Sequence, residues 1–470
     1  MNPYRIPIAT SVRLVAALVT LAMMTSCHSG GGGCPSGNCP QYLLLEGALS
    51  GLVGSGLGLM NGSQLAAGFS GSMANGNQVT FDVTNSNTAY NLTIQYQPTN
   101  PSQTCVISNG SGMTGTTDVT NIAVTCTTNP PRFAYVANQG SNNISAYSID
   151  AATGTMTALP GSPFAAGNLP VAIAVDLTGH FAYVVNQKDA TLSAFLIDRT
   201  SGALSEVSGS PFATGLSPTS VAIAIDLSGS FVYVANGGAG SLSAYAITAA
   251  SGALTALSGS PYAAGNSPSS VAVDEQGGYV YVTNKADGTV SAFEILGAGA
   301  GADGMGTLNV PLGSPFAVGE GPQAVVSPGG GIVYVANAAS NSLSSFGAVG
   351  SGTISEIGDS PYPTGTTPYS IAMNPVGRFF YVANQGSNNI SGFLLRNGGV
   401  LAALTGSPFT AGAEPSSVAV ENTGNFAYVV NTGSDSVSVY AIDATSGALT
   451  PINGSPFATG PQPAAIAISN

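Results

Sequence analysis

The sequence predicts an all-β chain in which a small β-sandwich domain precedes a seven-bladed β-propeller. Three observations predict this fold: two motifs that each recur seven times, a low content of charged residues, and short β-prone runs between turn residues. Only 6% of the 470 residues are charged, whereas 44% are hydrophobic and 63 are glycine. This composition disfavours long helices and intrinsic disorder, and suits many short strands joined by tight turns.

The strongest pattern is a Tyr-Val-x-Asn motif that recurs at spacings of 47 to 53 residues. Its members are Tyr135 with Asn138, Tyr183 with Asn186, Tyr233 with Asn236, Tyr281 with Asn284, Tyr334 with Asn337, Tyr381 with Asn384, and Tyr428 with Asn431. A Ser-Pro-aromatic motif also recurs seven times and ends at Phe164, Phe212, Tyr262, Phe316, Tyr362, Phe409 and Phe457. Because two independent motifs occur equally often, the chain contains seven copies of one structural unit.

Each unit contains four β-prone runs, which we name strands A to D from the axis to the rim. In one copy they are residues 170–176, 181–186, 191–198 and 203–207. Strands A and B are almost continuously apolar, which indicates burial on both faces. Radial stacking of sheets buries both faces in this way, so seven four-stranded units predict a β-propeller.

The two ends of the repeat region complement each other. The propeller covers residues 132–470, and its first copy begins at strand B. The last copy continues past its strand D into residues 463–469, which read as a strand A with no strand B after it. We expect this last strand to complete the first blade and to remove the open edge of the ring.

The first residues have the features of an export signal. An apolar stretch at 14–24 is too short to span a bilayer and has the length of a signal-peptide core. It runs into Met24-Thr25-Ser26-Cys27, which resembles the lipobox of bacterial lipoproteins. This resemblance predicts a signal peptide at 1–26 and lipidation of Cys27; the other interpretation is an ordinary secretory signal with an incidental cysteine.

Lipidation would attach the protein to a membrane through its new N-terminus. His28 stands where aspartate retains many lipoproteins in the inner membrane, so the resemblance favours the outer membrane, on its periplasmic or cell-surface side. Residues 27–40 are rich in Gly and Ser and read as a flexible tether. Loss of residues 1–26 removes two arginines and no acid, so the mature chain is more acidic than the full-length net charge of −13.

Residues 41–128 predict a small antiparallel β-sandwich, with β-prone runs at 79–83, 92–97, 105–108 and 121–126. The region resembles the immunoglobulin-like modules of bacterial surface proteins, which implies a spacer role. Four cysteines remain beside Cys27. We expect disulfides between Cys105 and Cys126 and between Cys34 and Cys39. Metal binding is the other interpretation, although no histidine lies among these cysteines.

The repeat resembles the YVTN family of propellers, whose motif is matched in full by Tyr281-Val282-Thr283-Asn284. The layout of 132–470 is also similar to the seven-bladed lactonase propellers, which include 6-phosphogluconolactonase-like proteins. This resemblance implies the scaffold and raises lactone hydrolysis as an activity. Fold alone does not fix function, so the chemistry must come from particular residues.

In a propeller, the D–A and B–C loops share the face on which ligands usually bind. The weak catalytic candidates on this face are Lys188 with Asp189 and Lys285 with Asp287, each pair in a B–C loop. A carboxylate beside a lysine suits a general base, but solvated loop ion pairs explain the same residues. The arginines of the propeller and its histidine, His180, border turns of the opposite face. A phosphate group on the ligand face therefore lacks its usual guanidinium partner.

Two repeated motifs permit both a binding and a structural interpretation. The seven asparagines could ring the mouth of the propeller and bind sugar hydroxyls, or each could cap its own B–C turn. The Ser-Pro-aromatic residues could form an exposed collar, or could pack between blades. No cofactor and no metal site is expected, because the acidic turns carry too few carboxylates for Ca²⁺ and the Gly-rich runs lack a phosphate-loop lysine.

Three functions remain open. The sequence favours a binding or scaffold module at the cell envelope for a protein, peptide or glycan ligand. The alternatives are a hydrolase for a sugar lactone or another lactone, and purely structural surface-layer material. Nucleic acid is not an expected partner, because the chain has 8 basic and 21 acidic residues.

Overall fold

The structure is a computed structural model. It describes residues 42–470 apart from 55–56, 63, 70–76, 99–102, 131, 177, 227–228, 275–277, 297–305, 312, 329–330, 349–352, 377 and 470. The chain divides into two compact units between Thr128 and Asn129. The predicted signal peptide and tether, with Cys27, Cys34 and Cys39, lie outside the described residues. Within the described part of the chain, no helix has the length and hydropathy needed to cross a membrane.

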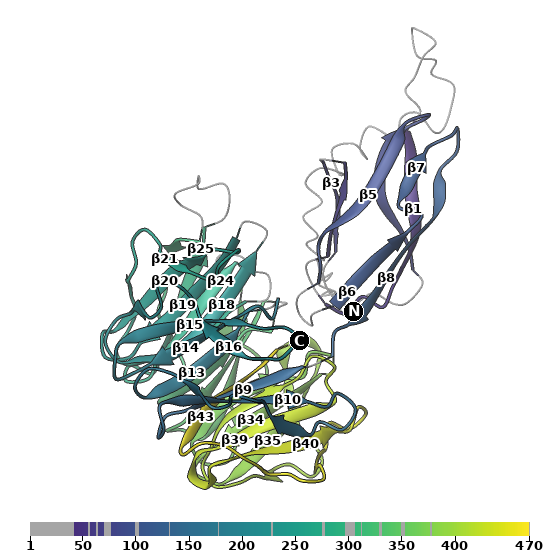
Figure 1. Cartoon of the computed structure of the whole chain (residues 1–470). Coiled ribbons are helices and arrows are strands. Elements are labelled where there is room, and N and C mark those ends of the chain that lie inside the picture. The colour runs from purple at the N-terminus through teal and green to yellow at the C-terminus, as the bar shows by residue number, and fades with distance from the viewer. Residues whose placement is uncertain are drawn as a thin grey trace, which may run out of the picture. The chain divides into compact units, whose positions relative to one another are not determined.

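The N-terminal unit consists of two four-stranded sheets (Figure 1). The first sheet has the order β4 (Asn77–Asn85), β1 (Tyr42–Ser50), β8 (Val119–Thr128) and β6 (Gln103–Ser108). The second has the order β3 (Gln64–Phe69), β2 (Leu57–Asn61), β5 (Ala89–Tyr96) and β7 (Ser111–Met113). Leu45, Leu59 and Phe81, which are almost fully buried, belong to one hydrophobic core. The likeness to immunoglobulin modules stays a prediction.

Strands β1, β2, β3 and β7 were not among the predicted strands, which were residues 79–83, 92–97, 105–108 and 121–126. The predicted antiparallel arrangement is wrong at one pair, because β1 runs parallel to β8 where Gly47 pairs with Ile122. A Cβ atom at Gly47 would lie 1.7 Å from the carbonyl oxygen of Ile122, so the close approach of the two strands requires glycine.

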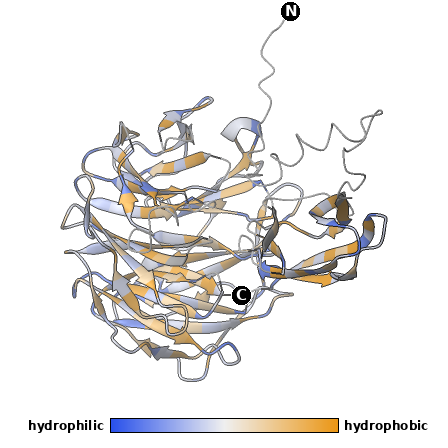
Figure 2. Ribbon diagram, turned by 90° about the horizontal axis from the view of Figure 1, so that it is seen from above, coloured by the Kyte–Doolittle hydropathy of each residue, from blue (hydrophilic) through white to orange (hydrophobic). Residues whose placement is uncertain are grey.

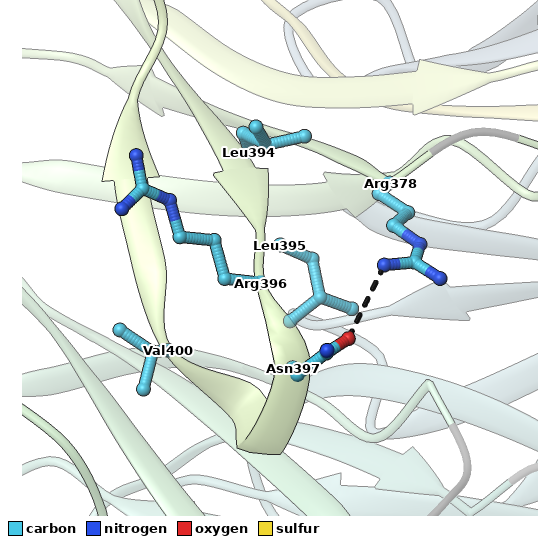
Figure 3. A pocket seen from close by; sticks show the side chains of 6 residues that line it. All are labelled: Arg378, Leu394, Leu395, Arg396, Asn397 and Val400. Carbon is cyan, nitrogen blue, oxygen red and sulfur yellow. Dashed lines mark hydrogen bonds between the residues drawn. The ribbon is translucent and has the colours of Figure 1, made fainter.

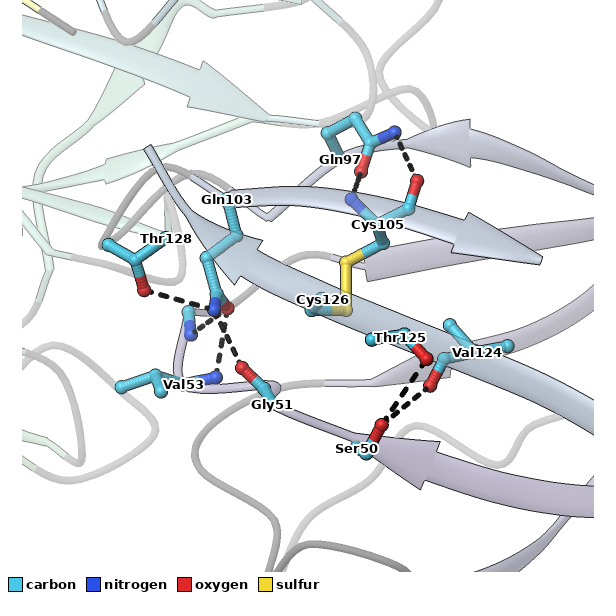
Figure 4. The surroundings of a disulfide bond; sticks show 11 residues. Ser50, Gly51, Val53, Gln97, Gln103, Cys105, Val124, Thr125, Cys126 and Thr128 are labelled. Atoms are coloured by element: carbon cyan, nitrogen blue, oxygen red, sulfur yellow. Dashed lines mark hydrogen bonds between the residues drawn. A yellow bond between two sulfur atoms is a disulfide. The ribbon is translucent and has the colours of Figure 1, made fainter. Parts of the chain in front are cut away.

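A disulfide joins Cys105 of β6 to Cys126 of β8, which are directly paired in the sheet (Figure 4). The side chain of Gln97 accepts a hydrogen bond from the Cys105 N–H at 2.7 Å and donates one to its carbonyl at 3.1 Å. At the start of β6, the buried Gln103 donates to the Gly51 carbonyl at 2.7 Å and accepts the N–H groups of Val53 and Gly54 at 2.8 and 2.7 Å. These contacts hold the first half of the edge strand β6.

The second unit is a propeller of seven five-stranded sheets, counted over the described residues. Blade 2 shows the pattern: β13 (Pro170–Val175), β14 (Phe181–Asn186), β15 (Thr191–Ile197) and β16 (Leu204–Glu206) are strands A to D. All six residues of β14 are buried, as its apolar sequence predicts. A fifth strand was not predicted: β17 (Phe212–Ala213), in the Ser-Pro-aromatic segment, pairs with β15.

The other blades repeat this order. Blade 1 contains β43 (Pro463–Ser469), β9 (Phe133–Asn138), β10 (Asn143–Ile149), β11 (Met156–Ala158) and β12 (Phe164–Ala165). Blade 3 contains β18 (Pro218–Asp226), β19 (Gly229–Asn236), β20 (Ser241–Ile247), β21 (Leu254–Ala256) and β22 (Tyr262–Ala263). Blade 4 contains β23 (Pro268–Val273), β24 (Tyr279–Asn284), β25 (Thr289–Ile295), β26 (Leu308–Asn309) and β27 (Phe316–Ala317).

The remaining three blades have the same composition. Blade 5 contains β28 (Pro322–Val326), β29 (Ile332–Asn337), β30 (Ser342–Ala348), β31 (Ile354–Glu356) and β32 (Tyr362–Pro363). Blade 6 contains β33 (Pro368–Met373), β34 (Phe379–Asn384), β35 (Asn389–Leu395), the 3-10 helix η2 (Asn397–Gly399), β36 (Leu401–Ala403) and β37 (Phe409–Thr410). Blade 7 contains β38 (Pro415–Val420), β39 (Phe426–Asn431), the 3-10 helix η3 (Thr432–Ser434), β40 (Ser436–Ile442), β41 (Leu449–Pro451) and β42 (Phe457–Ala458).

The C-terminal strand closes the ring. Strand β43 pairs antiparallel with β9, from Pro463 opposite Asn138 to Ser469 opposite Phe133, and the two lie side by side in Figure 1. Each strand A also contacts the strand A of both neighbouring blades, all the way round from β43 to β38 and back to β43. The first blade therefore takes its inner strand from the end of the chain.

The motif tyrosines join successive blades. Each one is almost fully buried in strand B, and, over the described residues, six of the seven donate a hydrogen bond to a glycine carbonyl in the C–D turn of the next blade. Tyr428 of blade 7 donates to Gly154 of blade 1 at 3.2 Å, which links the last blade to the first. Hydrophobic colours dominate the strands in Figure 2, as this burial requires.

Candidate functional site

The loops of the propeller sort into two faces. The backbone N–H of Gln187, in a B–C loop, donates to the carbonyl of Leu169, in the preceding D–A loop, at 2.9 Å. We call this side, with the D–A and B–C loops, the loop face. The N–H of Ile197, at the start of a C–D turn, donates to the carbonyl of His180, at the end of an A–B turn, at 2.8 Å. This opposite side is the turn face.

The motif asparagines are not available to a ligand, because each is 0% exposed. Asn186 is representative: its Nδ2 donates to the hydroxyls of Thr191 and Ser193 on strand C, at 3.1 and 2.9 Å. Its Oδ1 accepts the N–H of Gly167, in the D–A loop, at 3.1 Å. A sugar-binding ring of asparagines is therefore wrong. The asparagines instead bond to strand C in every blade and, in blades 2, 3, 4 and 7, also to the D–A loop.

The D–A loop approaches this asparagine so closely that glycine is required. A Cβ atom at Gly167 would lie 2.5 Å from Cγ of Asn186. The same conflict of 2.5 to 2.8 Å with the asparagine Cγ occurs at Gly215, Gly265, Gly319, Gly365, Gly412 and Gly460. The pair of asparagine and glycine thus sets the shape of the loop face in all seven blades.

The two predicted lysine–aspartate pairs lie on the loop face but are not brought together, because Lys188 and Asp189 belong to blade 2, and Lys285 and Asp287 to blade 4. Both lysines are exposed. Asp189 accepts the N–H and the Nδ2 of Asn168, at 2.6 and 2.8 Å, and these bonds lower its pKa.

Asp287 makes the same two contacts with Asn266, at 2.6 and 2.8 Å, and its pKa is also lowered by them. A carboxylate with a lowered pKa is a poor general base at neutral pH. The structure therefore gives both aspartates a loop-ordering role.

The Ser-Pro-aromatic residues pack rather than form a collar. Phe164 is half-buried and contacts the hydrophobic cluster that contains Tyr135 of blade 1 and Phe195 of blade 2. Ser162 of the same motif accepts the N–H of Ala146, on strand C, at 2.9 Å. The motif thus fastens the segment after strand D to strand C of its own blade and to the neighbouring blade.

A feature that the sequence did not reveal is a β-bulge at the start of every strand A. In blade 2, Pro170 pairs with Asn186 while Ala172 pairs with Val185, so Val171 is an extra residue with no partner. The equivalent residues of the seven blades are Val171, Thr219, Ser269, Gln323, Tyr369, Ser416 and Ala464. We call this set the bulge ring.

The bulge ring surrounds the axis of the propeller on its loop face, because strand A is the innermost strand and its first residues follow the D–A loop. Bulges commonly redirect side chains beside binding sites. The only sequence signal was the proline that begins each strand A, since the residue after it follows no motif.

Some members of the bulge ring join neighbouring blades. Thr219 donates its hydroxyl to the carbonyl of Pro268 at 2.9 Å, and Ser269 donates to that of Pro322 at 2.7 Å. Ser416 makes the corresponding bond to the carbonyl of Ala464 at 2.9 Å. In these three blades the polar group is occupied by the strand A of the next blade.

Blades 5 and 6 differ from this pattern. The Oε1 atom of Gln323 is buried and accepts no hydrogen bond from a described residue. Tyr369, at the next position round the ring, is half-buried, and desolvation raises the pKa of its hydroxyl. Gln323 and Tyr369 are therefore the bulge-ring residues whose donor and acceptor groups do not join neighbouring blades.

A carboxylate lies in the D–A loop that leads from blade 6 into blade 7. Glu414 immediately precedes the first proline of strand A in blade 7, and its N–H donates to Oδ1 of Asn388, in blade 6, at 2.8 Å. Its side chain is exposed, and no hydrogen bond to its carboxylate is recorded among the described residues. We therefore define the candidate site as Gln323, Tyr369 and Glu414, contributed by three successive blades.

The candidate site contains amide, phenol and carboxylate groups that suit a neutral polar ligand. Among the described residues there is no group of three or more His, Cys, Asp or Glu side chains that could hold a metal ion.

Comparison with known proteins identifies the scaffold. The family described as "Lactonase, 7-bladed beta-propeller" matches residues 99–221, 210–318 and 314–405. No curated protein sequence matches the chain.

Several solved structures are similar to the propeller. A proposed 6-phosphogluconolactonase from Bacteroides fragilis has a TM-score of 0.64 at 20% identity, covering 73% of this chain and 99% of that one. A protein from Lactobacillus plantarum has a TM-score of 0.61 at 22% identity, covering 73% and 100%. The periplasmic gluconolactonase PpgL of Pseudomonas aeruginosa has a TM-score of 0.61 at 19% identity, covering 72% and 99%. At these identities the likeness shows the fold alone.

Proposed function

The chain belongs to the lactonase family of seven-bladed β-propellers, and we propose that it hydrolyses the ring ester of an uncharged sugar lactone at the bulge ring. The observation that supports this most is the pair Gln323 and Tyr369, whose polar groups are left over where other blades use theirs for packing. The periplasmic gluconolactonase of similar fold fits an exported enzyme of this kind.

Hydrolysis of a lactone needs a donor for the carbonyl oxygen and a base for the attacking water. Tyr369, whose pKa is raised further above neutral by burial, carries its proton at neutral pH and donates a hydrogen bond to the carbonyl oxygen as negative charge develops there. Glu414 accepts a proton from the water while the water oxygen bonds to the carbonyl carbon. The ring C–O bond then breaks, and the released oxygen takes up a proton to give a hydroxy acid.

Gln323 positions the substrate in this proposal. Its Oε1 accepts a hydrogen bond from a sugar hydroxyl, which supplies the partner that this buried atom otherwise lacks. The product is a carboxylate. The negative net charge of the protein repels this product but not the neutral substrate, and so favours product release.

We predict that the enzyme prefers an uncharged lactone to a phosphorylated one. Purified protein should open glucono-δ-lactone clearly faster than the spontaneous rate and should not accelerate 6-phosphogluconolactone. The reason is that the site lacks an arginine among its described residues, while the acidic chain repels a phosphate. The measurement is loss of lactone near neutral pH.

Fast turnover of the phosphorylated lactone that disappears in a Lys188→Ala/Lys285→Ala variant would overturn this preference and identify those lysines as a phosphate site.

A second candidate function is binding of a sugar or glycan without turnover, as part of an envelope scaffold. The amide and hydroxyl groups of the bulge ring favour it, because these groups recognise sugar hydroxyls. The lactone assay separates the two functions, since a binding protein would show saturable association with a sugar but no acceleration of ring opening.

We further propose that the protein is exported and anchored by a lipid on Cys27, on the basis of Met24-Thr25-Ser26-Cys27. Cys27→Ser should abolish incorporation of a labelled fatty acid and release the protein from membranes, because the lipid is the expected attachment. Undiminished labelling of the variant would contradict the anchor.

A further inference from the structure

A shallow hollow lies on the turn face of blade 6 (Figure 3). Its lining combines two arginines with apolar side chains, and its volume is about 550 Å³. The lining residues are Arg378, Leu394, Leu395, Arg396, Asn397 and Val400. This volume lies within the range of roughly 300–1,000 Å³ that is usual for small-molecule sites.

The two arginines come together because the A–B and C–D turns are adjacent. The N–H of Leu395 donates to the carbonyl of Arg378 at 2.6 Å, so Arg396 begins a turn directly beside Arg378. Figure 3 shows the two guanidinium groups on either side of Leu395. A ligand that meets both groups must therefore carry charge at two separated points.

Blade 6 differs from its neighbours at this position. The C–D turns of blades 1, 2 and 7 begin with Asp150, Asp198 and Asp443, whose carboxylates accept N–H groups of the turn. In blade 1 the arginine equivalent to Arg378 is Arg132, and it lies beside the turn of Asp150. In blade 6 Arg396 replaces the aspartate, so the acidic group is exchanged for a second cation.

The turn itself is also changed. Arg396 N–H donates to the carbonyl four residues later, whereas Asp198 N–H donates to the carbonyl five residues later. The shorter turn is the 3-10 helix η2, and it needs no carboxylate to cap it. The backbone of η2 does not depend on an aspartate at position 396. The arginine there therefore changes the charge of the turn relative to blades 1, 2 and 7.

Neither guanidinium has a carboxylate partner among the described residues. Arg378 Nη1 donates to Oδ1 of Asn397 at 3.4 Å, which is a long and weak contact. Two cations beside each other repel, and the rest of the chain is strongly acidic, with a net charge of −13. An anion in the hollow would remove this repulsion.

We propose that this hollow binds a small organic dianion with two carboxylates on a short apolar spacer. Each guanidinium takes one carboxylate, ideally through two parallel hydrogen bonds, and Leu395 and Val400, which pack on the same side of blade 6, contact the spacer. The site is separate from the proposed active site, because it lies on the turn face and not on the loop face.

Calorimetric titration of the purified chain with adipate, hexanoate and inorganic phosphate tests this proposal. Adipate should bind at least about tenfold more tightly than hexanoate, because it engages both arginines. Arg378→Gln and Arg396→Gln should each weaken adipate binding to the level of hexanoate. Arg396→Asp introduces the residue that blades 1, 2 and 7 have at this position and should abolish binding of both compounds.

Arg132→Gln is the matched control, since Arg132 precedes β9 as Arg378 precedes β34, and it should leave adipate binding unchanged. Thermal melting of every variant establishes that it is folded. Equal affinity for adipate and hexanoate, equal affinity for adipate and phosphate, or undiminished binding in Arg396→Asp would each overturn the dianion site.

Discussion

Deletion of residues 463–470 is expected to unfold the propeller or to cause it to aggregate. The deletion removes β43, which pairs with β9 over its whole length and supplies the buried side chain of Ile466 to the core between blades 7 and 1. The free energy lost with these hydrogen bonds and apolar contacts is comparable to the whole unfolding free energy of a typical domain, about 5–15 kcal/mol. The exposed edge of β9 would also become a template for association with other chains.

Thermal unfolding and size-exclusion chromatography of the truncated chain measure this effect. The deletion leaves Tyr428 and Gly154, which join blade 7 to blade 1 by a hydrogen bond, in the chain. Tyr428→Phe in the full chain removes only that bond, so it is a useful comparison with a much smaller expected effect. A truncated protein that stays monomeric and melts at the wild-type temperature would show that the C-terminal strand is not needed to close the ring.

Asn186→Ala is expected to destabilise the propeller by roughly 2–4 kcal/mol, because buried polar groups lose their partners. The N–H of Gly167 and the hydroxyls of Thr191 and Ser193 all bond to this side chain. Chemical denaturation followed by circular dichroism measures the change in unfolding midpoint.

Asn384→Ala is the matched comparison within the same chain. Asn384 keeps two donor bonds, to Asn389 and Ser391, but its Oδ1 has no partner, and the N–H of Gly365 bonds to Ser391 instead. Its replacement should therefore cost about 1 kcal/mol less than that of Asn186. Equal effects at the two positions, or no effect at Asn186, would contradict the role given to the asparagine oxygen.

The repeat scaffold is largely predictable from sequence because each blade obeys the same local rules. The Tyr-Val-x-Asn motif marks strand B, since its tyrosine is buried and its asparagine bonds to strand C in every blade, as Tyr183 and Asn186 do. The fifth strand, such as β17, was missed because two residues carry no periodic pattern. Strand β1 was missed because its pairing depends on the close approach of β8 at Gly47, which no local pattern shows.

The candidate site was less predictable, for a physical reason. Ionisable residues such as Asp189 are the catalytic candidates that a sequence offers, but their hydrogen-bond partners are known only from the folded loops. Gln323 and Tyr369 are prominent only because a register shift turns them into bulge residues and because other blades use this position for packing. Register and unsatisfied groups are properties of the pairing, and no single residue pattern encodes them.

The most direct test of the proposed activity is the rate of glucono-δ-lactone hydrolysis by the wild-type protein and by Tyr369→Phe, assayed side by side. Val171→Ala, at the equivalent bulge of blade 2, is the control and should keep wild-type activity. The wild type should accelerate hydrolysis over the spontaneous rate, and removal of the donor hydroxyl should lower kcat by about 10²-fold. Absence of acceleration by the wild type, or full activity of Tyr369→Phe, would contradict catalysis at the bulge ring.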